Sequence, residues 1–194
     1  MSLNTEQLRN PALKDYAEKH LDGLVRIAKL GIPILATADY VSVSANMKVG
    51  TYTIAHQPDV PRNITVTHTT VAVGADVLGT ITVLGTDRNN KVISEVMTPL
   101  AGAVATGLRA FKTITSITGA GWVIAGGNDT ITIGVGAVLG LPFPISSTEF
   151  CYGVVGTANV AGTAVSDVEL SKNTVDLSAG TYDGSKKVFA YLSE

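Results

Sequence analysis

The 194-residue chain has little of what usually carries chemistry or cross-links. It has one cysteine, Cys151, so an intrachain disulfide and a multi-cysteine zinc site are excluded. Charged residues make up 15% of the chain, against an average of about 25%. Aromatic residues make up 6%, and the net charge is −2. Because no basic cluster is present to neutralise phosphates, the composition argues against nucleic-acid binding.

Long hydrophobic runs are also missing. The nearest candidate, Gly31 to Ala38, is far shorter than the roughly 18–20 apolar residues that a membrane-spanning helix needs. Residues 1–20 alternate charged and apolar side chains and lack the apolar core of a secretory signal. We therefore expect a protein that is synthesised in the cytoplasm of its host, with no signal peptide and no membrane partner.

No motif of a known reaction or metal site is present. His20, His56 and His68 have no second ligand at a metal-binding spacing, which favours structural roles for all three. The serines lack the G-x-S-x-G pattern, and Cys151 lacks a cysteine-protease signature. We therefore expect no enzyme activity, no catalytic residue, no metal and no cofactor. The alternative is an unrecognised hydrolase, in which His56 or His68 meets a serine, Cys151 or a carboxylate from a distant part of the chain.

The first 33 residues carry a helical period. Asn10 and Pro11 suit the start of a helix, and apolar residues then recur at three- and four-residue steps. This pattern predicts one amphipathic α-helix over residues 12–30. Its apolar side holds the candidate assembly interface: Leu13, Tyr16, Leu21, Leu24 and Ile27. We interpret residues 1–33 as an N-terminal helical arm, which packs either on its own domain or on a neighbouring subunit.

After Pro33 the period changes from 3.6 to 2. Short segments alternate apolar residues with threonine, a residue whose branched Cβ favours strands. Turn-forming residues follow at 86–90, 126–129 and 182–185. The pattern predicts a mainly β protein, with an antiparallel β-sandwich or barrel-like domain over residues 34–194.

Two prolines between residues 139 and 144 exclude an interior strand at that place. We interpret this stretch as a crossing segment between a central β unit, about 48–138, and a C-terminal β unit, about 149–194. The two units could share one sandwich.

Four stretches resemble structural proteins of tailed bacteriophages and prophages, found among their head and tail components. They are Arg62–Thr67, Leu78–Asp87, Val92–Glu95 and Gly107–Ile117, and the C-terminal Gly180–Val188 also fits the style of this group. The resemblance covers about residues 60–136. It implies a β-sandwich-like subunit of a symmetric particle, without catalytic residues, whose N-terminal helix serves as an assembly arm.

The resemblance leads us to expect a virion structural protein that forms a homo-oligomer and binds other virion proteins. Capsid decoration, or another role at the head, is favoured over a tail or neck role. The alternative is a carbohydrate-binding or adhesin-type module, since immunoglobulin-like adhesins share these hairpin and strand patterns. That module would need an exposed aromatic surface, for which Trp122 is the candidate. A core or interface position for Trp122 is favoured, because sugar-stacking surfaces usually need more aromatic residues.

Overall fold

A computed structural model of the chain describes residues 25–70, 76–124 and 127–193. These residues form antiparallel strands joined by short loops and three 3-10 turns. The elements are β1 (Val25–Gly31), β2 (Thr37–Asn46), η2 (Met47–Val49), β3 (Arg62–Thr69), β4 (Val77–Thr86), β5 (Val92–Met97), β6 (Val104–Phe111), β7 (Thr113–Val123), β8 (Thr130–Gly140), β9 (Cys151–Val155), β10 (Ala158–Ala161), β11 (Thr163–Val165), η3 (Leu170–Lys172), β12 (Thr174–Asp176), η4 (Ser178–Gly180) and β13 (Val188–Ser193). The mainly β, sandwich-like architecture predicted from the sequence is confirmed.

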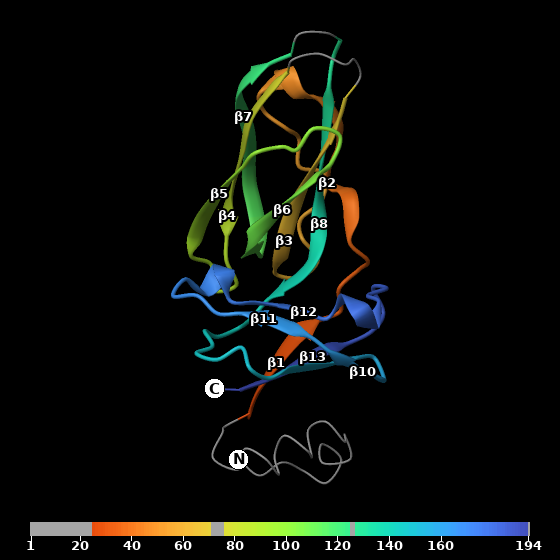
Figure 1. The fold of residues 1–194 in the computed structure, drawn as a ribbon, viewed down its shortest axis with the longest axis vertical. Helices are drawn as coiled ribbons and strands as arrows, with labels where there is room; N and C mark the ends of the chain where they lie inside the picture. The colour runs from red at the N-terminus through yellow and green to blue at the C-terminus, as the bar shows by residue number, and fades with distance from the viewer. Residues whose placement is uncertain (1–24, 71–75, 125–126, 194) are drawn as a thin grey trace.

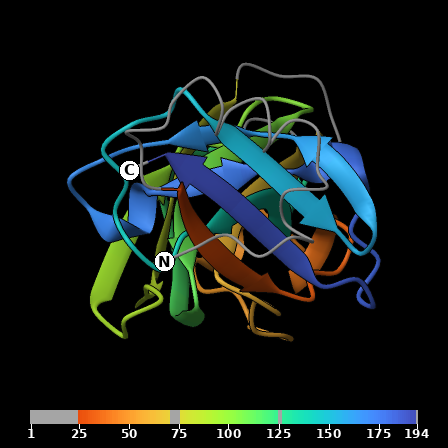
Figure 2. The same cartoon turned by 90° about the horizontal axis from the view of Figure 1, so that it is seen from below.

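The strands form three sheets. A six-stranded sheet has the order β11-β12-β8-β3-β6, with β2 also paired to β8, and a three-stranded sheet has the order β5-β4-β7. In Figure 1 strands β2 to β8 form an upright sandwich, which we call the upper sandwich, while β11 and β12 lie across its lower end. A four-stranded sheet of order β1-β13-β9-β10, the lower sheet, lies across the same end, as the view from below in Figure 2 shows. We call this sheet, together with β11, β12 and η3, the lower unit.

Two hydrophobic cores correspond to this arrangement. The upper core lies between the sheets of the sandwich and includes Ile64, Val66, Ile81, Val83, Phe111, Ile117, Ile131 and Ile133. The lower core includes Ala28, Leu30, Leu139, Val155, Val175, Leu177, Val188 and Leu192. Strand β8 contributes to both, because Ile131 and Ile133 are in the upper core and Leu139 is in the lower one. One continuous strand, β8, therefore links the two cores.

The helix predicted over residues 12–30 is wrong wherever the structure describes those residues. Val25–Gly31 form β1, which pairs antiparallel with β13 from the other end of the chain. Ala28 and Leu30 are buried while Lys29 between them is exposed, which is the two-residue period of a strand. Over so short a window this period also fits a helical stripe, and pairing with β13 decides between them. Residues 12–24 lie outside the described part of the chain.

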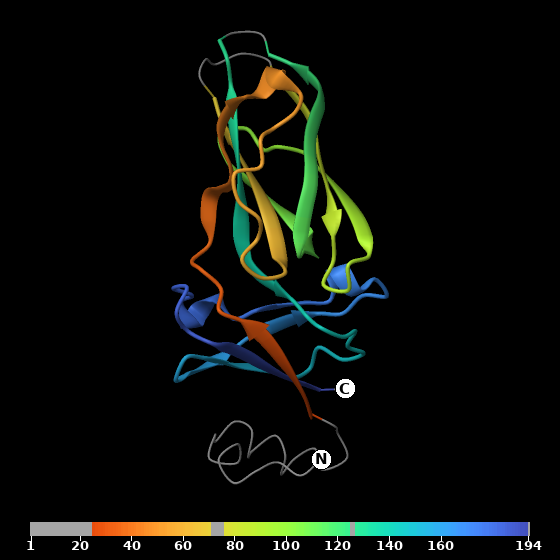
Figure 3. The same ribbon diagram turned by 180° about the vertical axis from the view of Figure 1, so that it is seen from behind.

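The described part of the proposed arm is therefore integrated into the lower sheet, and from there the chain rises into β2 of the sandwich (Figure 3). Within the described ranges, no helix has the length and apolar character needed to span a membrane.

Candidate interaction site

The two lateral edges of the three-stranded sheet differ in how they are covered. Along β7, the Tyr52 amide donates to Ile117 O at 3.0 Å, and the Gly119 amide donates to Gly50 O at 3.0 Å. The Gln57 side chain also bonds both the N–H and the C=O of Ile114, at 2.7 and 2.9 Å. The segment 50–57 thus covers this edge. Strand β5, at the opposite edge, has no second strand partner among the described residues.

The β4–β5 hairpin fixes which backbone groups of β5 face outward. The Asp87 amide donates to Lys91 O at 2.9 Å and closes the turn, where Asn90 has φ of 64°. In an antiparallel ladder, hydrogen-bonded and non-hydrogen-bonded pairs alternate from this point. Residues Val92, Ser94 and Val96 therefore occupy non-hydrogen-bonded positions toward β4. Their N–H and C=O groups point to the free edge of the sheet.

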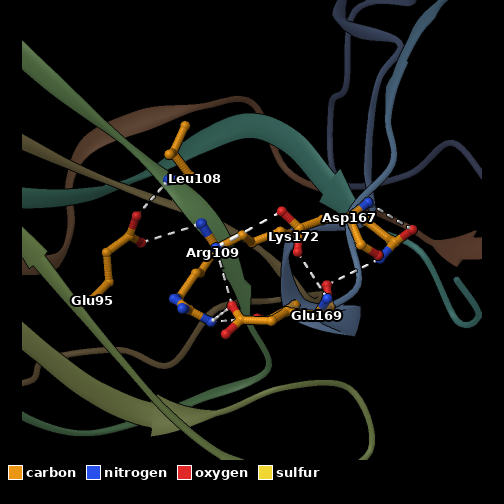
Figure 4. A network of polar contacts seen from close by, with 8 residues as sticks. Glu95, Leu108, Arg109, Asp167, Glu169 and Lys172 are labelled. Atoms are coloured by element: carbon orange, nitrogen blue, oxygen red, sulfur yellow. Dashed lines mark hydrogen bonds and ion pairs between the residues drawn. The ribbon is translucent and has the colours of Figure 1, made fainter. Parts of the chain in front are cut away.

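On its inner side, β5 reaches β6 through one carboxylate. Glu95 Oε1 accepts from the Leu108 amide at 2.6 Å and Oε2 accepts from the Arg109 amide at 3.2 Å (Figure 4). Strand β6 is bulged here, since its register with β3 shifts between Asn63 and Thr65. A Cβ on Gly107 would lie 2.7 Å from Glu95 Oε2, so this close approach requires glycine. Glu95 thereby satisfies two amides that the bulge withdraws from the ladder.

The same region joins the sandwich to the lower unit through an ionic cluster. Arg109 Nη1 lies 2.6 Å from Glu169 Oε2 and donates to Ser171 Oγ at 2.9 Å. Lys172 Nζ lies 3.2 Å from Glu169 Oε2 and 3.8 Å from Asp167 Oδ2. Hydrogen bonds from Arg109 and Lys172 lower the pKa of Glu169. These groups are partly exposed, so solvent screening keeps their contribution to stability modest.

A groove of about 430 Å³ separates β5 from the segment that leads into η3. Lys91, Val92, Ile93 and Ser94 line it on the β5 side, and Val168, Glu169, Leu170 and Ser171 line it on the other. Val168 is fully exposed. Backbone of an outer strand and an unburied aliphatic side chain therefore border the same space.

The outer face of β4, β5 and β7 is uncharged. Glu95 is the only charged residue in these three strands, and it faces β6. The strands nevertheless carry these exposed aliphatic side chains: Val77, Leu84, Val92, Val96 and Val123. Val92 and Val96 are 68% and 64% exposed. A soluble protein normally intersperses charges over such a surface, so this face is suited to contact with protein.

The positions of His56 and His68 give no support to a hydrolase, and His20 lies outside the described part of the chain. Buried His68 places Nε2 at 2.9 Å from Asp129 Oδ2, while its Nδ1 accepts from the Gly102 amide at 3.1 Å. The amide fixes Nδ1 as the acceptor, so Nε2 carries the proton and no ring nitrogen is left to activate a nucleophile. His56 instead stacks on Tyr40, with ring centroids 5.0 Å apart.

Cys151 is a half-buried thiol at the start of β9. Burial, followed by the nearby Asp176 carboxylate, raises its pKa to about 12. The reactive thiolate is therefore scarce at neutral pH. Over the described ranges, no group of three or more histidine, cysteine and acidic side chains is arranged to hold a metal ion.

Two buried polar side chains at the start of β3 are findings of the structure that sequence reasoning missed. Arg62 donates through Nε and Nη2 to Gly136 O and through Nη1 to Ile34 O at 3.0 Å. The same Nη1 lies 3.1 Å from Asp59 Oδ1. Asn63 accepts from the Val138 amide at 3.1 Å and donates to Gly107 O at 3.2 Å. The available signal was a charged and an amide residue at the start of a strand whose other residues are aliphatic, threonine and one histidine.

The structure places two of the site residues predicted from the sequence. Ile27 is half-buried on β1 opposite Tyr191, so it belongs to the lower sheet rather than to a helix. Trp122 is half-buried on β7 opposite Leu78 and packs against the upper core. A Cβ on Gly119 would lie 2.8 Å from its indole, which shows that the ring covers that glycine. The other predicted interface residues, Leu13, Tyr16, Leu21 and Leu24, lie outside the described part of the chain.

Comparison of the chain with protein-family models, with curated proteins and with solved structures finds no significant match.

Proposed function

We propose that this chain is a structural subunit that acts by protein–protein assembly in a phage or prophage particle. The observation that carries the assembly role is the uncharged outer face of β4, β5 and β7 with its exposed valines and leucine. Burying this face against protein removes apolar area from water and leaves no ionic group unpaired. Association at such a face is favourable at about 25 cal/mol per Å² of buried apolar surface.

The phage setting has a separate basis. It rests on the resemblance of residues 60–136 to head and tail components of tailed phages. A decoration role at the head is preferred, with a tail or neck position as the alternative. In either case the subunit binds other virion proteins and further copies of itself.

The first experiment is the solution mass of the full chain by light scattering over a wide range of concentrations. We expect a defined oligomer. The matched chain begins at Val25, because a chain that begins at Ile34 would lose β1 and its buried Ala28 and Leu30. If the chain that begins at Val25 forms a smaller oligomer than the full chain, residues 1–24 contribute to assembly. A monomer at every concentration for both chains contradicts homo-oligomeric assembly.

The particle setting has its own experiment. Particles released by prophage induction from the bacterium that carries the gene would be purified and analysed by mass spectrometry. We expect peptides of this chain in the particle fraction at a stoichiometry of many copies. Recovery of the chain only from the soluble fraction would contradict a virion role while leaving self-association intact.

A further inference from the structure

The free edge of β5 is the least protected strand edge in the described part of the molecule. Natural sheets protect their edges by shortening, bulges, outward charges or a covering segment. Among the other edges, β10 and β11 have four and three residues, β1 has a register shift beside Lys29, β2 is irregular, β6 is bulged and bonded by Glu95, and β7 is covered. Strand β5 has six regular residues, and its only charge, the inward Glu95, is bonded to the β6 amides. Its edge is therefore a ready template for another strand.

The geometry of β5 matches an antiparallel copy of itself. Val92, Ser94 and Val96 all point their backbone N–H and C=O groups outward. Centring the pair on Ser94 places Val92 opposite Val96 of the second copy, Ser94 opposite Ser94, and Val96 opposite Val92. All three pairs are then hydrogen-bonded, and four exposed valines meet on one face. Shifting the register by two residues separates at least one of these valine pairs.

The charged residues near β5 are also compatible with this antiparallel pairing of two β5 strands. A two-fold axis brings a surface against itself, so any charge close to the axis would oppose its own copy. Glu95, the charge nearest the axis, is turned to the inner side and bonded to the Leu108 and Arg109 amides, and the next charge along the chain is Lys91. In the Ser94-centred register, two Lys91 residues lie six residues apart along the strands, or about 20 Å at about 3.4 Å per residue. That separation exceeds a Debye length of about 8 Å.

The groove supplies room for the incoming strand. It runs beside Lys91, Val92 and Ser94, where Val96 and Met97 of the second copy would enter. Fully exposed Val168, on the far side of the groove, would then contact the entering strand.

We propose that β5 pairs with β5 of a second copy about a two-fold axis at Ser94, which joins the two three-stranded sheets into one continuous six-stranded sheet. This inference rests on the proposed function, since it requires self-association, and it names the surface and the partner.

Disulfide trapping tests the register. In Ser94→Cys, paired Cα atoms about 5.5 Å apart are within the span of a disulfide. We expect mild oxidation of the full chain to convert Ser94→Cys to a covalent dimer. Thr118→Cys, on the covered strand β7, is the matched control and stays uncross-linked, as does the wild-type chain with its shielded Cys151. Cross-linking of Ser94→Cys no faster than Thr118→Cys would overturn the proposal.

A second variant tests the pairing without a new covalent bond. Val92→Lys/Val96→Lys puts charges on two side chains that are already exposed, so its circular dichroism and melting temperature should match wild type. We expect the dissociation constant of the dimer to rise at least about tenfold, since edge lysines block strand pairing. An unchanged oligomer in this variant would overturn the β5 interface and leave self-association standing. A wild-type chain that is monomeric at every concentration would overturn both proposals.

Discussion

The upper sandwich and the lower unit are built from the chain in opposite ways. The upper sandwich uses strands β2 to β8, which follow one another between residues 37 and 140. The four-stranded sheet of the lower unit instead joins β1 from one end of the chain to β13 from the other, and this sheet contacts β12 at the end of β8 through the lower core. Within the sandwich only β4 and β5 pair as sequence neighbours, while β2 and β3 both pair with β8 from the far end of that segment. The β1–β13 pair closes a still larger loop, almost the whole described chain.

The two regions therefore differ in which parts of the sequence complete their hydrophobic cores. The upper core is completed within the one segment 37–140, although its strands pair across that segment, and its irregular points are held by buried polar side chains such as Arg62 and Asn63. The lower core depends on a strand that arrives from the far end of the sequence. The shared strand β8 couples the two regions, because one set of backbone bonds supports both. Four predictions probe this comparison.

The largest effect is expected from removing β1. A chain that begins at Ile34 loses buried Leu30 and Ala28 and exposes the edge of β13. Truncating one buried leucine side chain alone costs about 2–5 kcal/mol, so the free energy of unfolding should fall by at least about 4 kcal/mol. Urea denaturation followed by circular dichroism measures the change. The chain that begins at Val25 is the control, and equal stability of the two truncated chains would show that β1 is dispensable.

The next largest effect is expected from replacing Arg62, at the start of β3. Arg62→Ala leaves Gly136 O, Ile34 O and the Asp59 carboxylate without their buried partner. Removing one partner from a buried ionic network costs about 3–5 kcal/mol. The control, Arg88→Ala, removes a more exposed arginine that donates to Lys29 O and Gly140 O, and should cost about 1 kcal/mol. Equal losses in the two variants would contradict a special role for Arg62.

A paired substitution in β8 tests whether the two cores unfold together. Ile133→Ala and Leu139→Ala each create a cavity, one in each core, and each should cost about 2–5 kcal/mol. Because β8 is shared, we expect a single transition in both variants, with Trp122 fluorescence and circular dichroism changing at the same urea concentration. An early circular dichroism change in Leu139→Ala, with the Trp122 signal retained, would divide residues 34–194 into two folding units.

The smallest effect is expected at Asp183, in the turn before β13. Its carboxylate accepts from the Ser185 amide at 2.9 Å, from Ser185 Oγ at 2.8 Å and from the Lys186 amide at 3.0 Å. These bonds hold the pKa of Asp183 well below its ordinary value of 3.8. Because the folded pKa is depressed, the stabilisation is present above the unfolded pKa and is lost as pH falls toward the folded one.

Asp183→Asn should therefore be slightly less stable than wild type at neutral pH, and the difference should shrink below about pH 4. Melting temperatures measured from neutral pH down to pH 2 provide the test. A difference that grows on acidification would contradict the assignment.

Local residue patterns predicted much of what the structure contains. The turn at 86–90 is present with Asp87 accepting from the Asn89 and Lys91 amides, as short polar turn residues do. The turn at 182–185 is present as well, and a strand follows it. Burial alternates along β4 as its threonines and aliphatic residues alternate. Each of these features is set by residues within a few positions of one another.

The assembly site could not be predicted in the same way. The run at residues 91–95 after the turn predicted strand β5. No local pattern shows that, among the described residues, its outer edge has no strand partner while that of β7 is covered by residues 50–57. The neutral face likewise depends on which strands become neighbours. Glu95 would interrupt that neutrality if it faced outward, and only the bulge of β6 shows where its carboxylate goes.

By itself, then, the sequence determined that the chain is a β protein with these turns, without disulfides and with little charge. Side-chain branching, turn chemistry and the two-residue period act within a few residues, so they are legible in the chain. The tertiary structure alone decided that residues 25–31 are a strand, that Arg62 is buried, that β8 belongs to two cores, and that β5 has no second strand partner among the described residues. Each of those outcomes depends on pairing with residues far away in the sequence, where backbone hydrogen bonds and shared burial outweigh local preference.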